Sequence, residues 1–257
     1  MDRVSDEPVR TETVLGKAVT ILRVFGFDDG VLPLAELVRR TGLHKATVYR
    51  LCGELVELRL LDKSPDGYRL AGGLFELGMR ASTERGLLEL AMPFLQDLYE
   101  RTHETVHLGV REGHEVVYVA KIGGHRQARS PSRVGGRMPM HCTAIGKILL
   151  AYDHEDLRRE VLAGPLPRHT PHTVVVPGLL GVQLDRAGDA GVAFEREESA
   201  IGLTCIAAPV LGPDGRALAA ISIAGPTNRL RPEQHIPALR AAATALANVV
   251  RRRFETG

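Results

Sequence analysis

Apolar residues recur at helical spacing twice within residues 34–58, and this pattern is the clearest structural signal in the chain. A short first segment ends at Thr41 and Gly42, and a longer second segment follows. In residues 61–70, apolar and polar side chains alternate on either side of a turn at 64–67, which predicts a β-hairpin. The apolar stripe of the second helix is formed by Val48, Leu51, Leu55 and Leu58.

Positive charges and hydroxyls gather near the start of that second helix. No acidic residue lies between Glu36 and Glu54, whereas the interval holds Arg39, Arg40, Lys45 and Arg50. Such a helix, supported by a preceding short helix, suits insertion into the major groove of DNA, and the hairpin has the form of a wing. The alternative is an ordinary helix pair with a solvated charged face.

The remaining pattern divides the chain into four parts. Residues 1–12 are polar and are expected to be disordered. Residues 13–70 hold a first helix, the helix pair and the hairpin. Residues 71–86 are expected to form a linker helix that several glycines weaken. Residues 87–257 form a second domain in which a helix, a hairpin, further helices, three strands and a final helix follow one another, which predicts an α+β fold around a largely antiparallel sheet.

The elements of this second domain have predictable bounds. Strands are expected over 105–110, 116–122, 190–195, 204–211 and 217–224. Helices are expected over 87–101, 141–152, 156–162, 178–187 and after Pro232, and loops over 123–139 and 165–177.

Bulk properties narrow the class of protein. The chain has 257 residues, with 44% hydrophobic and 25% charged residues, which are values typical of a globular protein of two domains. Its net charge of +2 is too small for bulk affinity to nucleic acid, so DNA binding would need local clustering. Three cysteines without a CxxC pair predict neither a zinc module nor disulfides. No signal peptide or membrane-length apolar run is present, so a cytoplasmic protein without a cofactor is expected.

Residues 34–70 resemble the winged helix-turn-helix of the IclR family of bacterial transcription regulators, and the resemblance extends over residues 14–250. In the second domain it is carried by residues 136–147, 195–198, 202–210 and 219–226. The resemblance implies a winged helix-turn-helix domain, a linker helix and a GAF-like effector domain. It implies a repressor that binds double-stranded operator DNA and a small, carboxylate-like effector, acts as a dimer or tetramer, and is neither an enzyme nor a membrane protein.

The expected DNA contacts follow from the basic cluster and the wing. Side chains near the start of the second helix would contact bases, and the wing and the preceding helix would contact phosphates. These residues are Arg39, Arg40, His44, Lys45, Thr47, Tyr49, Arg50, Lys63 and Arg69.

An effector pocket is expected near a helix that begins around Thr143. Its backbone N–H groups would face an anion, and the small residues Ala144 and Gly146 would let a ligand approach the backbone. Some family members have glycine where Ala144 stands and serine where Ala224 stands, which favours a larger or more apolar carboxylate here. The pocket wall implied by the resemblance comprises Ser130, Met138, Ala144, Ile145, Glu195, Leu203, Cys205, Ser222 and Ala224.

The sequence offers little support for catalysis or metal binding. His141 and Cys142 could form a nucleophilic pair, but adjacency in sequence does not provide hydrogen-bond geometry. His169 and His172 lack a third metal ligand nearby in the sequence, so no metal site is expected and the histidines are expected at the surface. Glu197 and Glu198 are expected to be solvated in a loop.

Three alternative functions remain open at this stage. The protein could be a transcriptional activator of the same family, a small-molecule-binding enzyme or sensor, or a scaffold that uses the winged helix for protein contacts.

Overall fold

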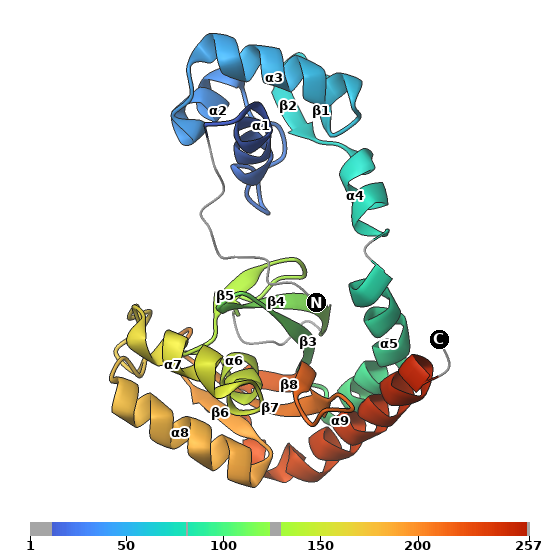
Figure 1. The fold of residues 1–257 in the computed structure, drawn as a ribbon, viewed down its shortest axis with the longest axis vertical. Coiled ribbons are helices and arrows are strands. Elements are labelled where there is room, and N and C mark those ends of the chain that lie inside the picture. Colours follow the sequence, from blue (N-terminus) through green and yellow to red (C-terminus); the bar gives the residue numbers. More distant parts are fainter. Residues whose placement is uncertain (1–11, 81, 124–129, 256–257) are drawn as a thin grey trace. The chain divides into compact units, whose positions relative to one another are not determined.

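The computed structural model describes residues 12–80, 82–123 and 130–255 (Figure 1). The chain forms two compact units, Met1–Arg85 and Gly86–Gly257. The tail predicted over residues 1–12 lies almost entirely outside the described residues. In the described part of the chain, no helix is both long and apolar enough to cross a membrane.

The first unit is a small helical domain with a β-hairpin. Its helices are α1 (Val14–Arg23), α2 (Leu34–Thr41), α3 (Lys45–Glu57) and α4 (Gly72–Gly78), and its strands are β1 (Leu61–Ser64) and β2 (Gly67–Leu70). Gly42 ends α2 in the left-handed conformation, with φ of 67°, and its N–H donates to Val38 O, which permits the tight turn into α3. The core comprises Ile21, Leu32, Leu37, Val48, Leu51, Cys52, Leu55, Leu61 and Tyr68.

The hairpin is fastened to Leu32, which lies two residues before α2. Leu32 and Tyr68 exchange backbone hydrogen bonds of 2.8 and 2.9 Å, so a short third strand segment joins the wing. Gly67 has φ of 144°, and a Cβ there would lie 2.2 Å from Leu32 O. Only glycine fits this position, because the backbone of Leu32 occupies the space of a side chain.

Two expectations for this unit are wrong. The linker helix predicted over 71–86 is two helices, since α4 ends at Gly78, Met79 and Arg80 form a turn, and α5 (Ser82–Thr102) begins afterwards. Leu58, which was expected in the buried stripe, is 67% exposed. It is the C-cap of α3, which ends at Glu57, so its side chain does not continue the buried face of the helix.

The second unit is built on one antiparallel sheet of six strands in the order β5-β4-β3-β8-β7-β6. β3 and β4 form a hairpin, β7 and β8 form a second, and β3 pairs with β8 to join them. The strands are β3 (Thr105–Glu112), β4 (Glu115–Ile122), β5 (Arg137–Pro139), β6 (Ala193–Arg196), β7 (Leu203–Leu211) and β8 (Ala217–Pro226).

Helices cover both faces of this sheet. α5 and α9 (Pro232–Glu255) pack on one face through a large aliphatic core. α6 (Ala144–Ala151), α7 (Glu155–Ala163) and α8 (Pro177–Ala190) build a second core on the other face. Because successive strand residues point to opposite faces, Ile221 and Ile223 face α5 and α9, while Ala220 joins the core with α6. The α+β architecture expected from the sequence is confirmed.

Several element bounds differ from expectation. β5 lies within the region predicted as a loop over 123–139, and its three residues pair with β4. β6 begins at Ala193 rather than 190, because α8 extends to Ala190. α6 begins at Ala144 rather than 141, since Thr143 is its N-cap.

Candidate functional site

The exposed face of α3 carries most of the side chains predicted to contact DNA. His44, Lys45, Tyr49 and Arg50 are exposed, and Thr47 is half-buried. The opposite face of α3 is buried in the core of the first unit. The helix is therefore held by one side while its first two turns present a cation, a hydroxyl and an aromatic ring to solvent.

The wing brings further predicted contacts to this face. Nζ of Lys63 lies 5.9 Å from the centre of the Tyr49 ring, so the wing and α3 meet at these two residues. Arg50 pairs with Glu54 at 2.5 Å and Arg69 with Asp62 at 3.0 Å, both on the surface. Exposed pairs of this kind are weak, so a phosphate or base edge could displace the carboxylates.

Arg39 and Arg40 are tied to acidic neighbours. Arg40 donates to Glu36, to Asp29 and to the carbonyl of Val24, which closes the end of α1. Arg39 donates to both oxygens of Glu36, at 2.8 and 2.6 Å. Hydrogen bonds from these arginines lower the pKa of Glu36 to about 2. Arg40 thus fastens the loop between α1 and α2, whereas Arg39 remains largely exposed.

A small cavity lies beside the start of α6 in the second unit. Its volume is about 10 Å³, which leaves room for about one water molecule. Eight of the nine side chains expected to form the pocket line it. They are Ser130, Met138, Ala144, Ile145, Glu195, Leu203, Cys205 and Ser222. Ala224 does not line it; it is buried on β8 between Thr105 and Cys205.

Sequence reasoning missed the group that organises this cavity. His107 on β3 is buried, and its Nδ1 lies 3.2 Å from Ser222 Oγ while its Nε2 lies 2.8 Å from Ser132 Oγ. Ser132 Oγ in turn lies 2.6 Å from Ser130 Oγ. Burial lowers the pKa of His107 to about 3, so the imidazole is neutral at neutral pH. A single histidine within a strand pattern gives no sign of whether its side chain is buried in a cavity or exposed at the surface.

Five more lining residues were not among the expected pocket wall: Tyr118, Pro131, Ser132, Thr143 and Ser199. The Tyr118 ring meets His107 edge to face at a centroid separation of 5.2 Å. The expectation that the histidines lie at the surface is wrong for His107 and for His141, which are 2% and 3% exposed.

Glu195 is the acidic group of the cavity. Its Oε1 accepts hydrogen bonds from the backbone of Glu198 and Ser199, at 2.9 and 3.1 Å. Its Oε2 is buried and has no hydrogen-bond partner among the described residues. Burial raises the pKa of Glu195, which favours the protonated acid, and a protonated carboxyl can donate a hydrogen bond. The cavity therefore contains a buried polar atom that a ligand could satisfy.

The start of α6 supplies backbone donors to the same cavity. The Thr143 hydroxyl accepts from Gly146 N at 3.1 Å and donates to Pro139 O at 3.0 Å. Helix geometry leaves the N–H groups of Ala144 and Ile145 without an intrahelical acceptor. The expected role of Gly146 is wrong, because it admits the backbone of Met140 and not a ligand: a Cβ there would lie 2.3 Å from Met140 Cα.

The expectation that Glu198 is solvated is also wrong. Glu198 is 5% exposed and pairs with Lys147 on α6, which is 1% exposed. Lys147 Nζ also donates to Phe194 O at 3.4 Å. This ion pair fastens the loop after β6 to the helix whose start lines the cavity.

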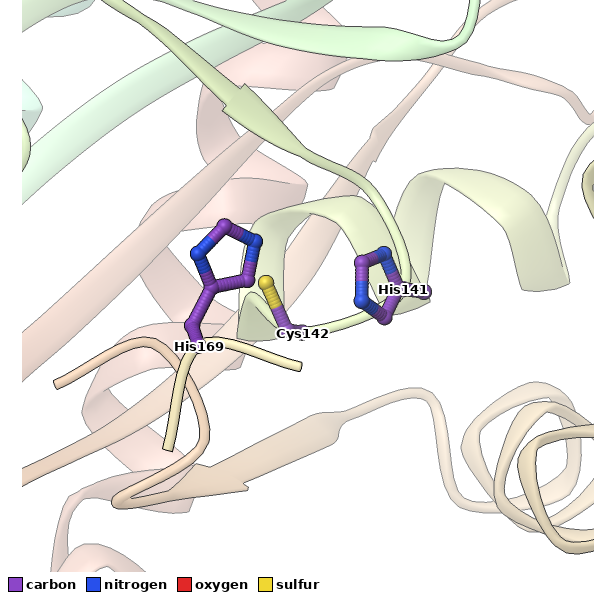
Figure 2. A group of neighbouring side chains, drawn as sticks. All are labelled: His141, Cys142 and His169. Carbon is purple, nitrogen blue, oxygen red and sulfur yellow. The ribbon is translucent and has the colours of Figure 1, made fainter. Parts of the chain in front are cut away.

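His141 and Cys142 precede α6, and the structure brings His169 beside them (Figure 2). One side-chain ligand atom from each of the three residues lies within 4.8 Å of the others. Burial raises the pKa of the Cys142 thiol to about 12. A nucleophilic cysteine needs a lowered pKa, so this environment does not support the hypothesis of a reactive pair.

Comparisons with known proteins cover both units. The family model "IclR helix-turn-helix domain" matches residues 14–65, and "Bacterial transcriptional regulator IclR C-terminal" matches residues 79–251. The HTH-type transcriptional regulator KdgR of Escherichia coli is 33% identical over 89% of this chain and 91% of its own length. The DNA-binding transcriptional repressor YiaJ of the same organism is 28% identical, over 96% and 91%.

A solved structure agrees over nearly the whole length. It is an IclR homologue from Microbacterium hydrocarbonoxydans complexed with 4-hydroxybenzoate, with a TM-score of 0.86 and 31% identity. The match covers 92% of this chain and 98% of that one.

Proposed function

This chain belongs to the IclR family of bacterial transcriptional regulators, and we propose that it represses transcription until a small organic carboxylate enters the second unit. The arrangement at the start of α6 carries the proposal. Backbone N–H groups without an intrahelical acceptor, the Ser222 hydroxyl and the buried carboxyl of Glu195 line one cavity. The N–H groups and the hydroxyl are donors suited to a carboxylate, and Met138, Ile145 and Leu203 supply apolar walls for its carbon skeleton.

Relatives support both halves of the proposal. YiaJ is named a repressor, and the Microbacterium homologue holds 4-hydroxybenzoate, an aromatic carboxylate. The activator alternative differs only in which state of the protein binds DNA. The exposed basic face of α3 favours DNA over a protein scaffold as its partner.

We propose that α3 contacts bases through Lys45, Thr47, Tyr49 and Arg50, with His44 at its start, and that Lys63 and Arg69 contact phosphate from the wing. Arg39 is exposed and can add a phosphate contact by leaving Glu36. Arg40 would have to give up Asp29, Glu36 and the Val24 carbonyl, so its main role is to hold α2 in place.

We propose that the regulator acts as a dimer or tetramer in the cytoplasm, where its operator is accessible. α4 and its C-cap expose three apolar side chains, Phe75, Leu77 and Met79, at 72%, 52% and 42%. A second copy that covered them would remove their apolar surface from water. Analytical ultracentrifugation of the purified protein gives the oligomeric state directly.

Fluorescence anisotropy tests the proposal. The full-length protein is titrated onto the duplex upstream of its own gene and onto a scrambled duplex, over a salt series. We expect preference for the native duplex and a fall in log affinity of about 0.9 per phosphate contact for each tenfold rise in salt. Monocarboxylates, beginning with 4-hydroxybenzoate, are then added. Release of DNA supports a repressor, and tighter binding would instead identify an activator. Equal binding to both duplexes at all salt concentrations contradicts the proposal.

A further inference from the structure

Two segments that are far apart in the sequence place three metal-binding side chains together. His141 and Cys142 come directly before α6, and His169 lies in the loop between α7 and α8. Their ligand atoms lie within 4.8 Å of one another, and the two imidazole rings have centroids 6.0 Å apart. In Figure 2 the sulfur of Cys142 lies between the two rings. The three side chains therefore form one cluster of candidate metal ligands.

Hydrogen bonds hold the loop that carries His169 in this place. Nε2 of His141 lies 3.0 Å from Pro167 O, so the ring of one candidate ligand contacts the backbone beside the other. The backbone N–H of His169 donates to Thr173 Oγ1 at 3.1 Å. The Thr173 hydroxyl donates to Glu198 O at 2.7 Å, and the Thr170 hydroxyl donates to Glu197 O at 2.6 Å. These hydrogen bonds hold the backbone of the loop beside His141 and leave the exposed side chain of His169 free to adjust.

The donor set selects the class of ion. Two imidazoles and one thiolate suit Zn²⁺, which prefers nitrogen and sulfur ligands in a tetrahedral arrangement. In such a site the donors would lie roughly 3.3–3.7 Å apart, given Zn–N and Zn–S bonds of about 2.0–2.3 Å. Because the ligand atoms lie within 4.8 Å of one another, binding an ion would require a contraction of at most about 1.5 Å. His169 is exposed and can rotate toward the buried pair.

We propose that His141, Cys142 and His169 bind one zinc ion, with a water molecule in the fourth position. Binding replaces the thiol proton of Cys142 by a Zn–S bond, and that proton leaves to solvent. The carbonyl of Pro167 accepts a hydrogen bond from His141 Nε2, which leaves the lone pair of the ring on Nδ1 for an ion.

The location gives the site a regulatory consequence. Cys142 is followed directly by Thr143, the N-cap of α6, and Thr143, Ala144 and Ile145 line the effector cavity. An ion that draws Cys142 toward His169 pulls on the start of α6. Zinc occupancy would then alter the cavity without entering it. The binding of zinc itself does not rest on the proposed repressor function.

Cobalt substitution of the full-length protein tests the site. Co²⁺ is added to chelator-treated protein, and thiolate-to-cobalt charge transfer and the intensity of the visible bands report sulfur ligation and tetrahedral geometry. Zn²⁺ affinity is then measured by competition with a chromophoric chelator. We expect one ion per chain and a charge-transfer band in the wild type.

Three variants make the result decisive. His169→Ala removes an exposed ligand and should lower Zn²⁺ affinity at least tenfold, and Cys142→Ser should abolish the charge-transfer band. His172→Ala is the matched control, because His172 is an exposed histidine of the same loop outside the group. A wild type without the band, a band that survives Cys142→Ser, or equal affinity in His169→Ala and wild type would overturn the proposal. If Cys142→Ser does not fold, the comparison of His169→Ala with His172→Ala decides alone.

Discussion

Lys147 and Glu198, separated by 51 residues, form an ion pair that is almost completely removed from solvent. Buried charges of this kind are tolerated only as a pair, because each alone would carry a large desolvation cost. The pair joins α6 to the loop after β6, and both of these elements contribute to the cavity wall.

Breaking this pair from one side should destabilise the second unit strongly. We expect Lys147→Met or Glu198→Gln alone to lower the free energy of unfolding by about 3–5 kcal/mol. The double variant should lose less than the sum, since no uncompensated charge remains. Urea unfolding followed by circular dichroism measures all three. Glu233→Gln, which removes one partner of the exposed Arg196–Glu233 pair, is the control and should cost less than about 1 kcal/mol. If Lys147→Met or Glu198→Gln lowered the free energy of unfolding no more than this control does, the expectation would be wrong.

Arg50→Ala should weaken binding to the operator by about 1–3 kcal/mol if Arg50 contacts a base edge or an ordered phosphate. Anisotropy on the native duplex measures the loss. Arg101→Ala is a matched control, because Arg101 is an exposed arginine in a similar pair with Asp97 on α5 of the second unit. An operator affinity unchanged by Arg50→Ala would remove Arg50 from the interface.

Ser222→Ala should weaken the response to a carboxylate while leaving DNA affinity unchanged. The change removes a hydroxyl from the cavity wall and a partner of His107. A lost hydrogen bond of about 1–1.5 kcal/mol corresponds to roughly a tenfold weaker effector. The carboxylate that releases the wild type from DNA is used for the titration. Thr204→Val is the control, since this hydroxyl on β7 bonds Thr227 and does not line the cavity. Equal loss of DNA binding and effector response would count against the site.

His107 should make the second unit less stable in acid. Below about pH 6.5 the unfolded chain takes up a proton at this histidine, whereas the folded chain does not until about pH 3. Stability therefore falls as pH is lowered through this window, by at most about 1.4 kcal/mol per pH unit from this group. The raised pKa of Glu195 acts in the opposite direction, so the contribution must be measured as a difference.

The comparison uses His107→Gln, which can still hydrogen-bond Ser222 or Ser132. Its free energy of unfolding should decline less steeply than that of the wild type between pH 6.5 and pH 4.5. Parallel profiles for the two proteins would show that His107 is not the group responsible.

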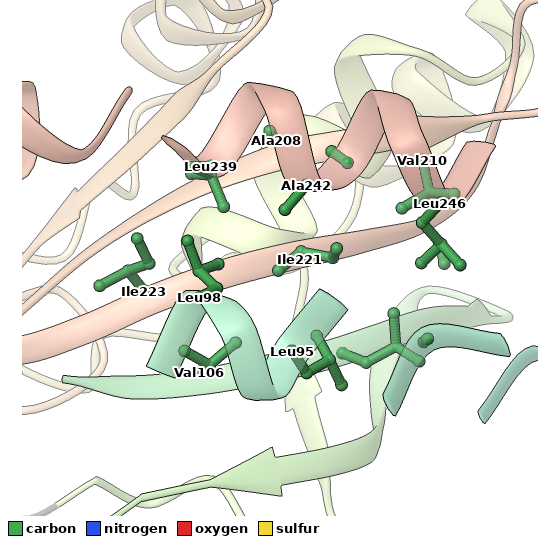
Figure 3. Packing of buried hydrophobic residues seen from close by; sticks show 14 of the residues in the cluster. Leu95, Leu98, Val106, Ala208, Val210, Ile221, Ile223, Leu239, Ala242 and Leu246 are labelled. Atoms are coloured by element: carbon green, nitrogen blue, oxygen red, sulfur yellow. The ribbon is translucent and has the colours of Figure 1, made fainter. Parts of the chain in front are cut away.

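Helices and strands in which apolar residues recur with a regular period were predictable from the sequence. The alternation along β8 places Ile221 and Ile223 against Leu98 and Leu239, as Figure 3 shows, and the apolar stripe of α3 identified its buried face. Lys45, Tyr49 and Arg50 on α3 are exposed because they lie off that stripe, whereas Thr47 is half-buried. The pocket residues were found through the family resemblance and not through periodicity.

Contacts between distant segments were not predictable. Lys147 is a polar residue in an apolar helix, and nothing in the sequence links it to Glu198. His169 was compared with His172, its neighbour in the chain, whereas its spatial partners lie 27 and 28 residues earlier. His107 gave no signal because its partners Ser132 and Ser222 are 25 and 115 residues away. Each of these groups depends on sheet register and loop closure, which local patterns do not specify.

The near absence of free space in the cavity bears on how fast the regulator can respond. A cavity that accommodates about one water molecule cannot admit a carboxylate of several carbon atoms until the packing of α6 against the sheet opens. Under the proposed function, effector entry is then a gated process, and its observed rate should reach a ceiling as effector concentration rises. The delay between the appearance of a metabolite and the release of DNA would be set by the rate at which α6 and the sheet separate, and not by diffusion of the effector.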